Sequence, residues 1–404
     1  MQLYKSTGFF GLFLKWSAML FAISFCLGLA LNSIGMVIFL IAGITVSVKD
    51  LLSGELKWNY RELNYPLGLL FFVIFCREFF LTHTGWEMAV LDYFSFLLLP
   101  LVIMLQSKRL QTFFPNIFLA FLVGCVLSAS INVSYAIFRG FIMNNGGINF
   151  WYFTYDFLAE PIGVQPIYLG MFYVFGLLIL FTYENLIKPK AFMYSCIIIL
   201  VMSVFLLAAR NAIVCLIVLL PLYLLVRKKL SFKKLALGIA VVGSCFSLAL
   251  LNPVIKNRIF KANSKGNVYS GTSLRTSIWQ SAISAAKNNE VWGSGKKKGS
   301  ELLLEEFETR KLEVPLKYKY HSHNQFLHTW VQYGLVGVLF LMVVFLMPLG
   351  LTFSRKNYLG VFWSLLILLT AMTESVFTRQ WGIFSFAFFS SLFLLTPKQT
   401  QPLA

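Results

Sequence analysis

Hydrophobic residues in this chain form long continuous runs instead of the short alternating patterns of a soluble protein. Taking about 17–22 residues for each membrane-crossing helix, the runs predict about twelve spans. They cover residues 9–30, 32–48, 66–82, 88–105, 114–138, 164–183, 191–209, 211–226, 235–253, 331–352, 358–375 and 381–396. We therefore predict an all-α polytopic membrane protein in three parts. Residues 1–252 hold spans 1–9, residues 253–330 form one large polar loop, and residues 331–404 hold spans 10–12 and a C-terminal tail.

Composition supports this assignment, and the distribution of charge predicts on which side of the membrane each connection lies. Of the 404 residues, 58% are hydrophobic, and the mean hydropathy is +0.75, too high for a soluble domain. The net charge of +18 would suggest nucleic acid in a soluble protein, but here lysine and arginine gather in the connections that follow even-numbered spans. By the positive-inside rule those connections and both termini are cytoplasmic. The loop 253–330 then faces the outside, and no nucleic-acid partner is expected.

The polar loop is expected to contain two helices. Apolar residues at positions 274, 278, 282 and 285 have the spacing of an amphipathic helix. Arg275 falls in its first turn, where a cation opposes the helix dipole, so we expect an anionic group to bind nearby. A second helix, roughly 300–312, is rich in Glu and Leu and is predicted to cover the site or to pack on the membrane surface.

Three of the four histidines, His321, His323 and His328, lie where this loop meets the tenth span. Ser322 and Gln325 have the spacing of a capping box, which predicts a helix that begins at Ser322 with His323 in its first turn. The helix dipole would keep that imidazole neutral and able to accept a proton. The alternative is that these histidines only pack at the membrane interface.

Two further polar turns on the predicted outer face carry charge. Arg210 stands between two apolar runs with almost no loop, so we expect it to be a fixed anion-binding residue unless it snorkels to the interface. Glu374 and Arg379 lie between the last two spans and either pair with each other or contribute to binding. All six cysteines lie in apolar segments, and the outer loops contain no D-x-D cluster, so we expect neither a metal ion nor a cofactor.

Taken together, these motifs resemble the O-antigen ligase family, which shares its fold with Wzy-type polymerases. The resemblance covers about residues 160–395, and its motifs are short but ordered as in the family. It rests on Arg210 between Ala209 and Asn211, on Arg275, Trp279, Gly293 and Gly295, and on His321, His323, Asn324, Gly334 and Gly337. It implies a GT-C-like fold and an inverting, metal-independent glycosyltransferase in the bacterial inner membrane, with its active site facing the periplasm.

The resemblance also implies roles for these residues. Arg210 and Arg275 would bind the pyrophosphate of an undecaprenyl-pyrophosphate-linked glycan, and His323 would deprotonate a hydroxyl of the acceptor, the lipid A-core in a ligase. His321 remains a second candidate for the base, because a helical wheel places it with Asn324 on the more polar face. Asn324, Arg379 and Glu374 are further possible binding residues. Membrane lipids are the remaining expected partners.

Three functional hypotheses follow from the sequence. The first is ligation of a lipid-linked glycan to the lipid A-core. The second is polymerisation of O-antigen or exopolysaccharide repeat units, or transfer of the glycan to protein, by the same fold. The third, from a different class, is non-enzymatic transport of lipid or polysaccharide.

Overall fold

The computed structural model describes residues 8–55, 93–144, 147–227, 232–260 and 272–395, with the single positions 68, 71, 74 and 76. Across these residues the regular structure is helical, without a β-strand, which confirms the all-α prediction. The predicted third span, 66–82, lies almost entirely outside the described residues, as does the first part of the fourth. The chain divides into two compact units.

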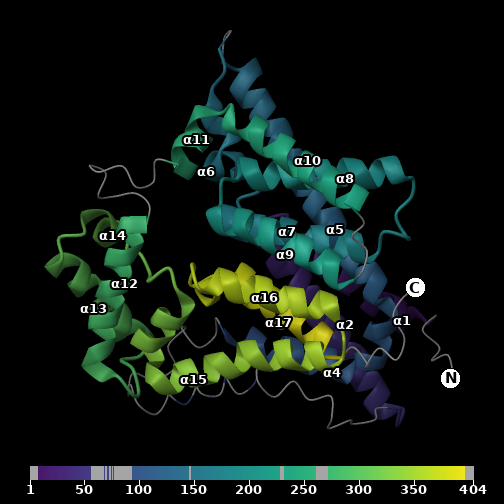
Figure 1. Cartoon of the computed structure of the whole chain (residues 1–404). Coiled ribbons are helices and arrows are strands. Elements are labelled where there is room, and N and C mark those ends of the chain that lie inside the picture. The colour runs from purple at the N-terminus through teal and green to yellow at the C-terminus, as the bar shows by residue number, and fades with distance from the viewer. Residues whose placement is uncertain are drawn as a thin grey trace. The chain divides into compact units, whose positions relative to one another are not determined.

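The first unit comprises residues 1–58, 105–261 and 356–366. In it, α5 packs against α1, α7 and α8, while α7 also packs against α9. The hydrophobic runs explain these helices, since each lies in or close to a predicted span. Its longer helices are α1 (Phe9–Ser24), α2 (Leu29–Leu52), α5 (Ser107–Ile137), α7 (Pro166–Thr182), α8 (Lys190–Leu206), α9 (Arg210–Val226), α10 (Phe232–Leu250) and α11 (Pro253–Phe260) (Figure 1).

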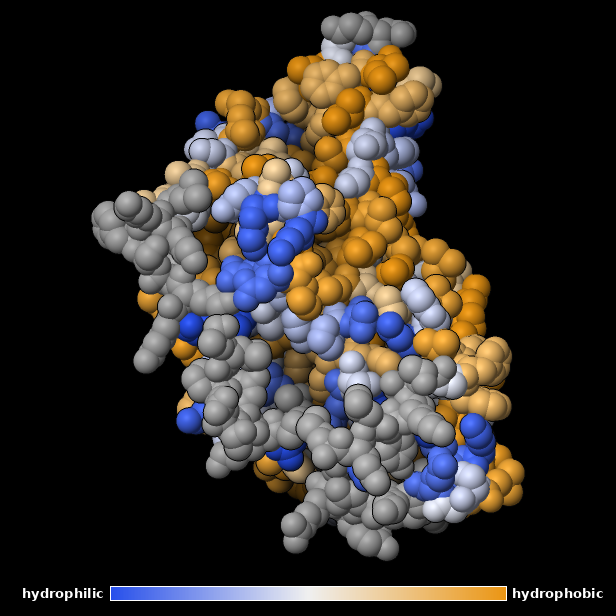
Figure 2. Space-filling model, turned by 90° about the vertical axis from the view of Figure 1, so that its right-hand side faces the viewer, coloured by the Kyte–Doolittle hydropathy of each residue, from blue (hydrophilic) through white to orange (hydrophobic). Residues whose placement is uncertain are grey.

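Helix α2 shows the inverted polarity of a membrane helix. Its outward side chains are large and apolar, with Ile34, Ile41 and Leu51 each more than half exposed, whereas Asn32 and Asp50 are buried. Figure 2 shows that hydrophobic residues cover large continuous areas of the face drawn there. Such surface is costly in water and suits a lipid environment.

By length and composition, three helices in the described residues could cross a membrane, namely Leu29–Leu52, Ser107–Ile142 and Gln325–Ser354. The bent pair Gly238–Leu250 and Pro253–Phe260 would make a fourth, and seven shorter apolar helices have 10–17 residues. The structure is therefore that of a helical membrane protein, whereas the twelve-span count and the orientation stay predictions.

The second unit comprises residues 59–104, 262–355 and 367–404, and helix α16 (Tyr358–Ala371) runs from the first unit into it. In Figure 1, α12, α13 and α14 lie side by side, and both α12 and α13 also pack against α15. The elements of this unit are α4 (Ser95–Leu105), α12 (Thr272–Ala286), η6 (Lys287–Asn289), α13 (Lys296–Thr309), α14 (Glu313–Lys317), α15 (Gln325–Ser354), η7 (Val376–Thr378) and α17 (Gln380–Leu395).

The amphipathic prediction for α12 is confirmed. Its four predicted apolar positions are all buried, and they form one hydrophobic cluster with Leu303 and Phe307 of α13 and Val331 of α15. Burial of apolar area at about 25 cal/mol per Å² is the main force that can hold the two loop helices on α15. The second predicted helix, roughly 300–312, corresponds to α13, which begins and ends a few residues earlier.

Candidate functional site

Helix α15 begins later than the capping-box pattern predicts. Its N-cap is Asn324, whose Oδ1 accepts hydrogen bonds from the amides of Phe326 (2.9 Å) and Leu327 (3.1 Å). The Ser322 hydroxyl donates instead to the carbonyl of Asn324, and Gln325 donates to Thr329. The predicted start at Ser322 is therefore wrong, because Asn324 is an equally good cap two residues downstream.

His323 consequently lies before the helix and not in its first turn. Its φ is 48°, in the left-handed region that non-glycine residues adopt at a cost of about 1 kcal/mol. Strained backbone of this kind is found preferentially at functional sites. Because His323 precedes the N-cap, the predicted effect of the helix dipole on its imidazole does not apply.

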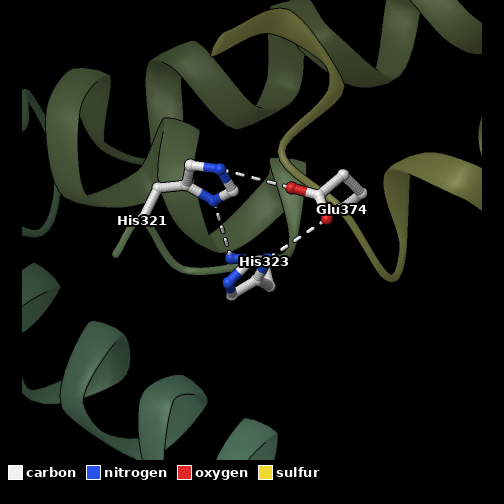
Figure 3. Close-up of side chains that lie close together, drawn as sticks. All are labelled: His321, His323 and Glu374. Carbon is white, nitrogen blue, oxygen red and sulfur yellow. Dashed lines mark hydrogen bonds and ion pairs between the residues drawn. The ribbon is translucent and has the colours of Figure 1, made fainter. Parts of the chain in front are cut away.

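The partner of both histidines is Glu374, from the segment between α16 and η7. Its side chain is almost fully buried, with Oε2 3.1 Å from Nδ1 of His323 and Oε1 3.3 Å from Nε2 of His321. Figure 3 shows the two rings converging on the one carboxylate. The alternative pairing of Glu374 with Arg379 is not formed in the described residues, where Arg379 is exposed.

The hydrogen bonds assign different roles to the two rings. The backbone amide of His323 donates to Nδ1 of His321 at 3.3 Å, so His321 carries its proton on Nε2, which contacts Oε1 of Glu374 at 3.3 Å without hydrogen-bond geometry. Nδ1 of His321 is thus occupied, and its Nε2 lies against the carboxylate of Glu374. His323 donates from Nδ1 to Glu374, and its Nε2 has no hydrogen-bond partner among the described residues. Since the His323 side chain is 24% exposed, this nitrogen can accept a proton from a bound hydroxyl.

Burial and neighbouring charges together set the pKa values of His321 and Glu374. The pKa of His321 is lowered to about 4, chiefly by burial; the charge of Glu374 opposes this shift, and the charges of His323 and Arg379 add to it. Burial would raise the pKa of Glu374, but the hydrogen bond from His323 and the charges of His323, His321 and Arg275 hold it below its ordinary value. At neutral pH the cluster therefore contains an ionised carboxylate and a neutral His321.

This arrangement predicts that acid destabilises the fold. Above about pH 6.5 His321 is neutral in both the folded and the unfolded chain, so its protonation does not reduce the free energy of unfolding there. As the pH falls toward 4 the unfolded chain takes up the proton first, and folding loses roughly 1–3 kcal/mol. The depressed pKa of Glu374 acts in the same direction at lower pH. We expect the thermal midpoint in detergent to fall between pH 6.5 and 4, and less so in His321→Gln. An equal drop in both proteins would contradict this assignment.

The structure brings one of the two predicted arginines close to the cluster. Arg275 lies in the first turn of α12, as predicted, is partly exposed, and is near enough for its charge to act on Glu374. Arg379 acts similarly on His321. Arg210 is the first residue of α9 and is exposed, but it belongs to the other compact unit.

The two glycine motifs meet in a backbone contact. Helix α15 is broken at Gly334, whose φ of 67° and ψ of −170° are not helical. The break frees the amides of Leu335 and Val336, which donate to the carbonyls of Glu290 (2.9 Å) and Val291 (3.2 Å). In return, the amides of Ser294 and Gly295 donate to the carbonyls of residues 331 and 332. We call residues 290–295 with 331–336 the glycine junction; it fixes α12 and α13 on α15.

The same cluster has the donor set of a metal site. One ligand atom each from His321, His323 and Glu374 lie within 4.8 Å of one another. Two imidazoles and a carboxylate suit a divalent transition metal. Sequence reasoning missed this possibility because Glu374 is 51 residues from His323 along the chain, and only the fold brings them together.

Comparison with known proteins agrees with these motifs. Residues 195–342 match the family model described as O-antigen ligase. The chain is also 24% identical over 180 residues to an uncharacterized protein of Haemophilus influenzae, an alignment that covers 42% of this chain and 45% of that relative. The family match includes Arg210, Arg275, His321, His323 and Asn324 and ends before Glu374 and Arg379. The stretch 195–342 therefore carries the sequence pattern of the O-antigen ligase family.

Proposed function

We propose that this protein is an inverting glycosyltransferase that moves a glycan from undecaprenyl pyrophosphate to a sugar hydroxyl. The family domain indicates membrane glycosyl transfer of the ligase or polymerase type. The observation that carries the finer proposal is the His323–Glu374 pair, in which the imidazole is held through Nδ1 while Nε2 is left to accept a proton.

In the proposed step, the acceptor hydroxyl oxygen attacks the anomeric carbon from the side opposite the leaving group. The new C–O bond forms as the bond to the pyrophosphate oxygen breaks, and the hydroxyl proton passes to Nε2 of His323. Glu374 orients the ring and stabilises the imidazolium that results, as a buried carboxylate does in hydrolase triads. The configuration at the anomeric carbon inverts because there is one displacement.

The leaving group needs charge stabilisation more than it needs an acid. Pyrophosphate departs as an anion of low proton affinity, and a guanidinium can bind it with two parallel hydrogen bonds. Arg275, whose charge reaches the cluster, is the first candidate. Arg210 is the second, proposed from its position in the family motif and at the N-terminus of α9. Asn324, as the cap, positions His323, and exposed Arg379 adds positive charge.

The acceptor defines the activity, and lipid A-core is the acceptor we propose. The alternatives are a second repeat unit, as in a polymerase, or a protein. An assay that offers the purified enzyme a lipid-linked donor with either lipid A-core or a second lipid-linked unit would distinguish the first two. We further propose that the site faces the periplasm from the inner membrane. A non-enzymatic transporter of lipid or polysaccharide would catalyse neither transfer.

Glu374→Gln tests whether the cluster acts as a base or as a metal site. The amide keeps the size of the side chain but loses the charge that supports His323, so we expect transfer to fall by about 10². Glu313→Gln, the same change at an exposed residue of α14, should leave the rate unchanged. Wild-type transfer should persist in excess EDTA. Loss of activity with EDTA and its return with a divalent ion would replace the base mechanism by a metal-dependent one.

A further inference from the structure

Three rings follow one another between the end of α14 and the proposed base. The rings of Tyr318 and Tyr320 are stacked, with 6.2 Å between their centroids and 29° between their planes. Tyr320 in turn meets the imidazole of His323 edge to face, at 5.4 Å and 87°. Both arrangements are ones that aromatic rings prefer. We call Tyr318, Tyr320 and His323 the aromatic strip; one end of it is the ring whose Nε2 we assign to proton acceptance.

The backbone at the end of α14 fixes the first two rings of the strip. Lys319 has a φ of 50°, in the left-handed region. The amide of Tyr320 donates to the carbonyl of Pro315 at 2.9 Å, and the amide of Lys319 donates to that of Leu316 at 3.3 Å. This is the hydrogen-bond pattern of a Schellman motif, in which glycine is the usual left-handed residue. The turn at Lys319 brings together two tyrosines that stand on either side of it in the sequence.

The two tyrosines differ in exposure. Tyr320 is partly buried and packs against the hydrophobic cluster formed by α12, α13 and α15. Tyr318 is 62% exposed, so its ring is open to a ligand. Single exposed aromatic residues are common on proteins. Tyr318 is distinguished by its position, because a fixed ring connects it to the proposed base.

The surroundings of Tyr318 argue against a membrane anchor. Tyrosines at a membrane interface commonly hold a protein in the bilayer. Lys317 and Lys319 stand directly before and after Tyr318, and both are exposed. Immersing this ring among acyl chains would draw two ammonium groups toward the hydrocarbon, which is costly. The ring therefore suits a ligand that comes from the aqueous side.

The charges near the ring select the class of ligand. The face of an aromatic ring is negative and disfavours an anion. A cationic ligand would be repelled by the ammonium of Lys317, whose Nζ lies 5.5 Å from the centroid of the Tyr318 ring. A pyranose can lay its C–H face on the ring and keep its hydroxyls in water. The exposed, flexible side chain of Lys317 can then move into water at little cost.

We propose that Tyr318 is a stacking platform for a pyranose ring of the acceptor glycan, beside the sugar whose hydroxyl reacts at His323. The proposal rests on the proposed glycosyl transfer and deepens it. The strip ends at the imidazole that takes the proton of the acceptor, whereas the pyrophosphate of the donor is assigned to arginine. The centroid spacings along the strip are similar to the size of a sugar ring. An acceptor that reaches His323 can therefore cover Tyr318 with a neighbouring unit.

Tyr318→Ala is the direct test, with purified full-length enzyme and lipid A-core as the acceptor. Because the side chain is exposed, the thermal midpoint should not change. Loss of the ring should raise the KM of the acceptor about tenfold and leave kcat and the KM of the donor nearly unchanged. Tyr318→Phe keeps the ring and should retain the wild-type KM. Tyr194→Ala, the same change at an exposed residue of α8, is the matched control.

The kinetic results can overturn the proposal in two ways. An unchanged acceptor KM in Tyr318→Ala would remove the platform and leave the enzyme in place. A rise in the KM of the donor alone would contradict the assignment to the acceptor. If Tyr318→Phe had the same defect as Tyr318→Ala, the hydroxyl and not the face of the ring would bind the ligand, and stacking would be wrong.

A binding measurement separates this proposal from the proposed function. Methyl glucopyranoside and methyl galactopyranoside would be the probes in saturation-transfer NMR, with the protein in a detergent that contains no sugar. We expect signal from at least one probe with wild type, Tyr318→Phe and His323→Ala, but not with Tyr318→Ala. This pattern in a wild-type protein without glycosyl transfer would retain the platform and overturn the enzyme. No signal with wild type, or equal signal with Tyr318→Ala, would overturn the platform.

Discussion

His323→Ala should lower glycosyl transfer by about 10³ while leaving donor binding nearly unchanged. The variant removes the Nε2 that we assign to proton acceptance, but it removes no group proposed to contact the pyrophosphate. The measurement is single-turnover transfer from a purified lipid-linked donor in detergent, with donor affinity determined separately. Imidazole added to the buffer should restore part of the rate to His323→Ala, since the truncated side chain leaves space for a free base.

The matched comparison is His321→Ala. Nδ1 of His321 already accepts from the amide of His323, and its Nε2 lies against the Glu374 carboxylate at 3.3 Å, so its loss should slow transfer less and should not be rescued by imidazole. Lys317→Ala, at an exposed position of α14, should have wild-type activity. Full activity of His323→Ala would show that His323 is not the base. A larger defect in His321→Ala than in His323→Ala, rescued by imidazole, would assign the base to His321.

Features that depend on residues close together in the sequence could be predicted best. The buried face of α12 depends only on helical spacing, and Leu274, Ile278 and Ala282 were placed correctly from it. The start of α15 depends on a choice between neighbouring caps. Ser322 and Gln325 matched a known pattern, yet Asn324 took the position, because Ser322 and Gln325 found other hydrogen bonds.

The candidate site was predictable only in part because it is assembled from distant segments. The histidines could be found as a cluster in the sequence, and Glu374 could be named as a possible binding residue. No local pattern indicates that one carboxylate contacts both rings, since the fold of the second unit brings residue 374 to residues 321 and 323. The choice between His321 and His323 likewise needed the hydrogen bonds of each ring nitrogen.

Gly334→Ala should unfold the glycine junction, and it is the substitution for which we expect the largest loss of stability. A Cβ at residue 334 would lie 2.1 Å from the carbonyl oxygen of Val291 and 2.6 Å from the amide nitrogen of Gly293. Both are backbone atoms, so no side-chain rotation relieves the clash. The backbone angles of Gly334 also lie in a region that is essentially restricted to glycine. We expect a cost of about 3 kcal/mol or more.

Gly350→Ala is the matched control, because it makes the same change in the same helix where no atom lies within 4 Å of the new Cβ. Gly293→Ala should behave like Gly334→Ala, since its Cβ would lie 2.4 Å from the carbonyl oxygen of Gln332. Thermal unfolding and limited proteolysis at the exposed lysines of α13 would measure the effect. Transfer should fall with stability, because the junction holds α12, and with it Arg275, on the helix that follows the two histidines. Equal stability of Gly334→Ala and Gly350→Ala would mean that the contact between 290–295 and 331–336 does not hold the loop helices in place.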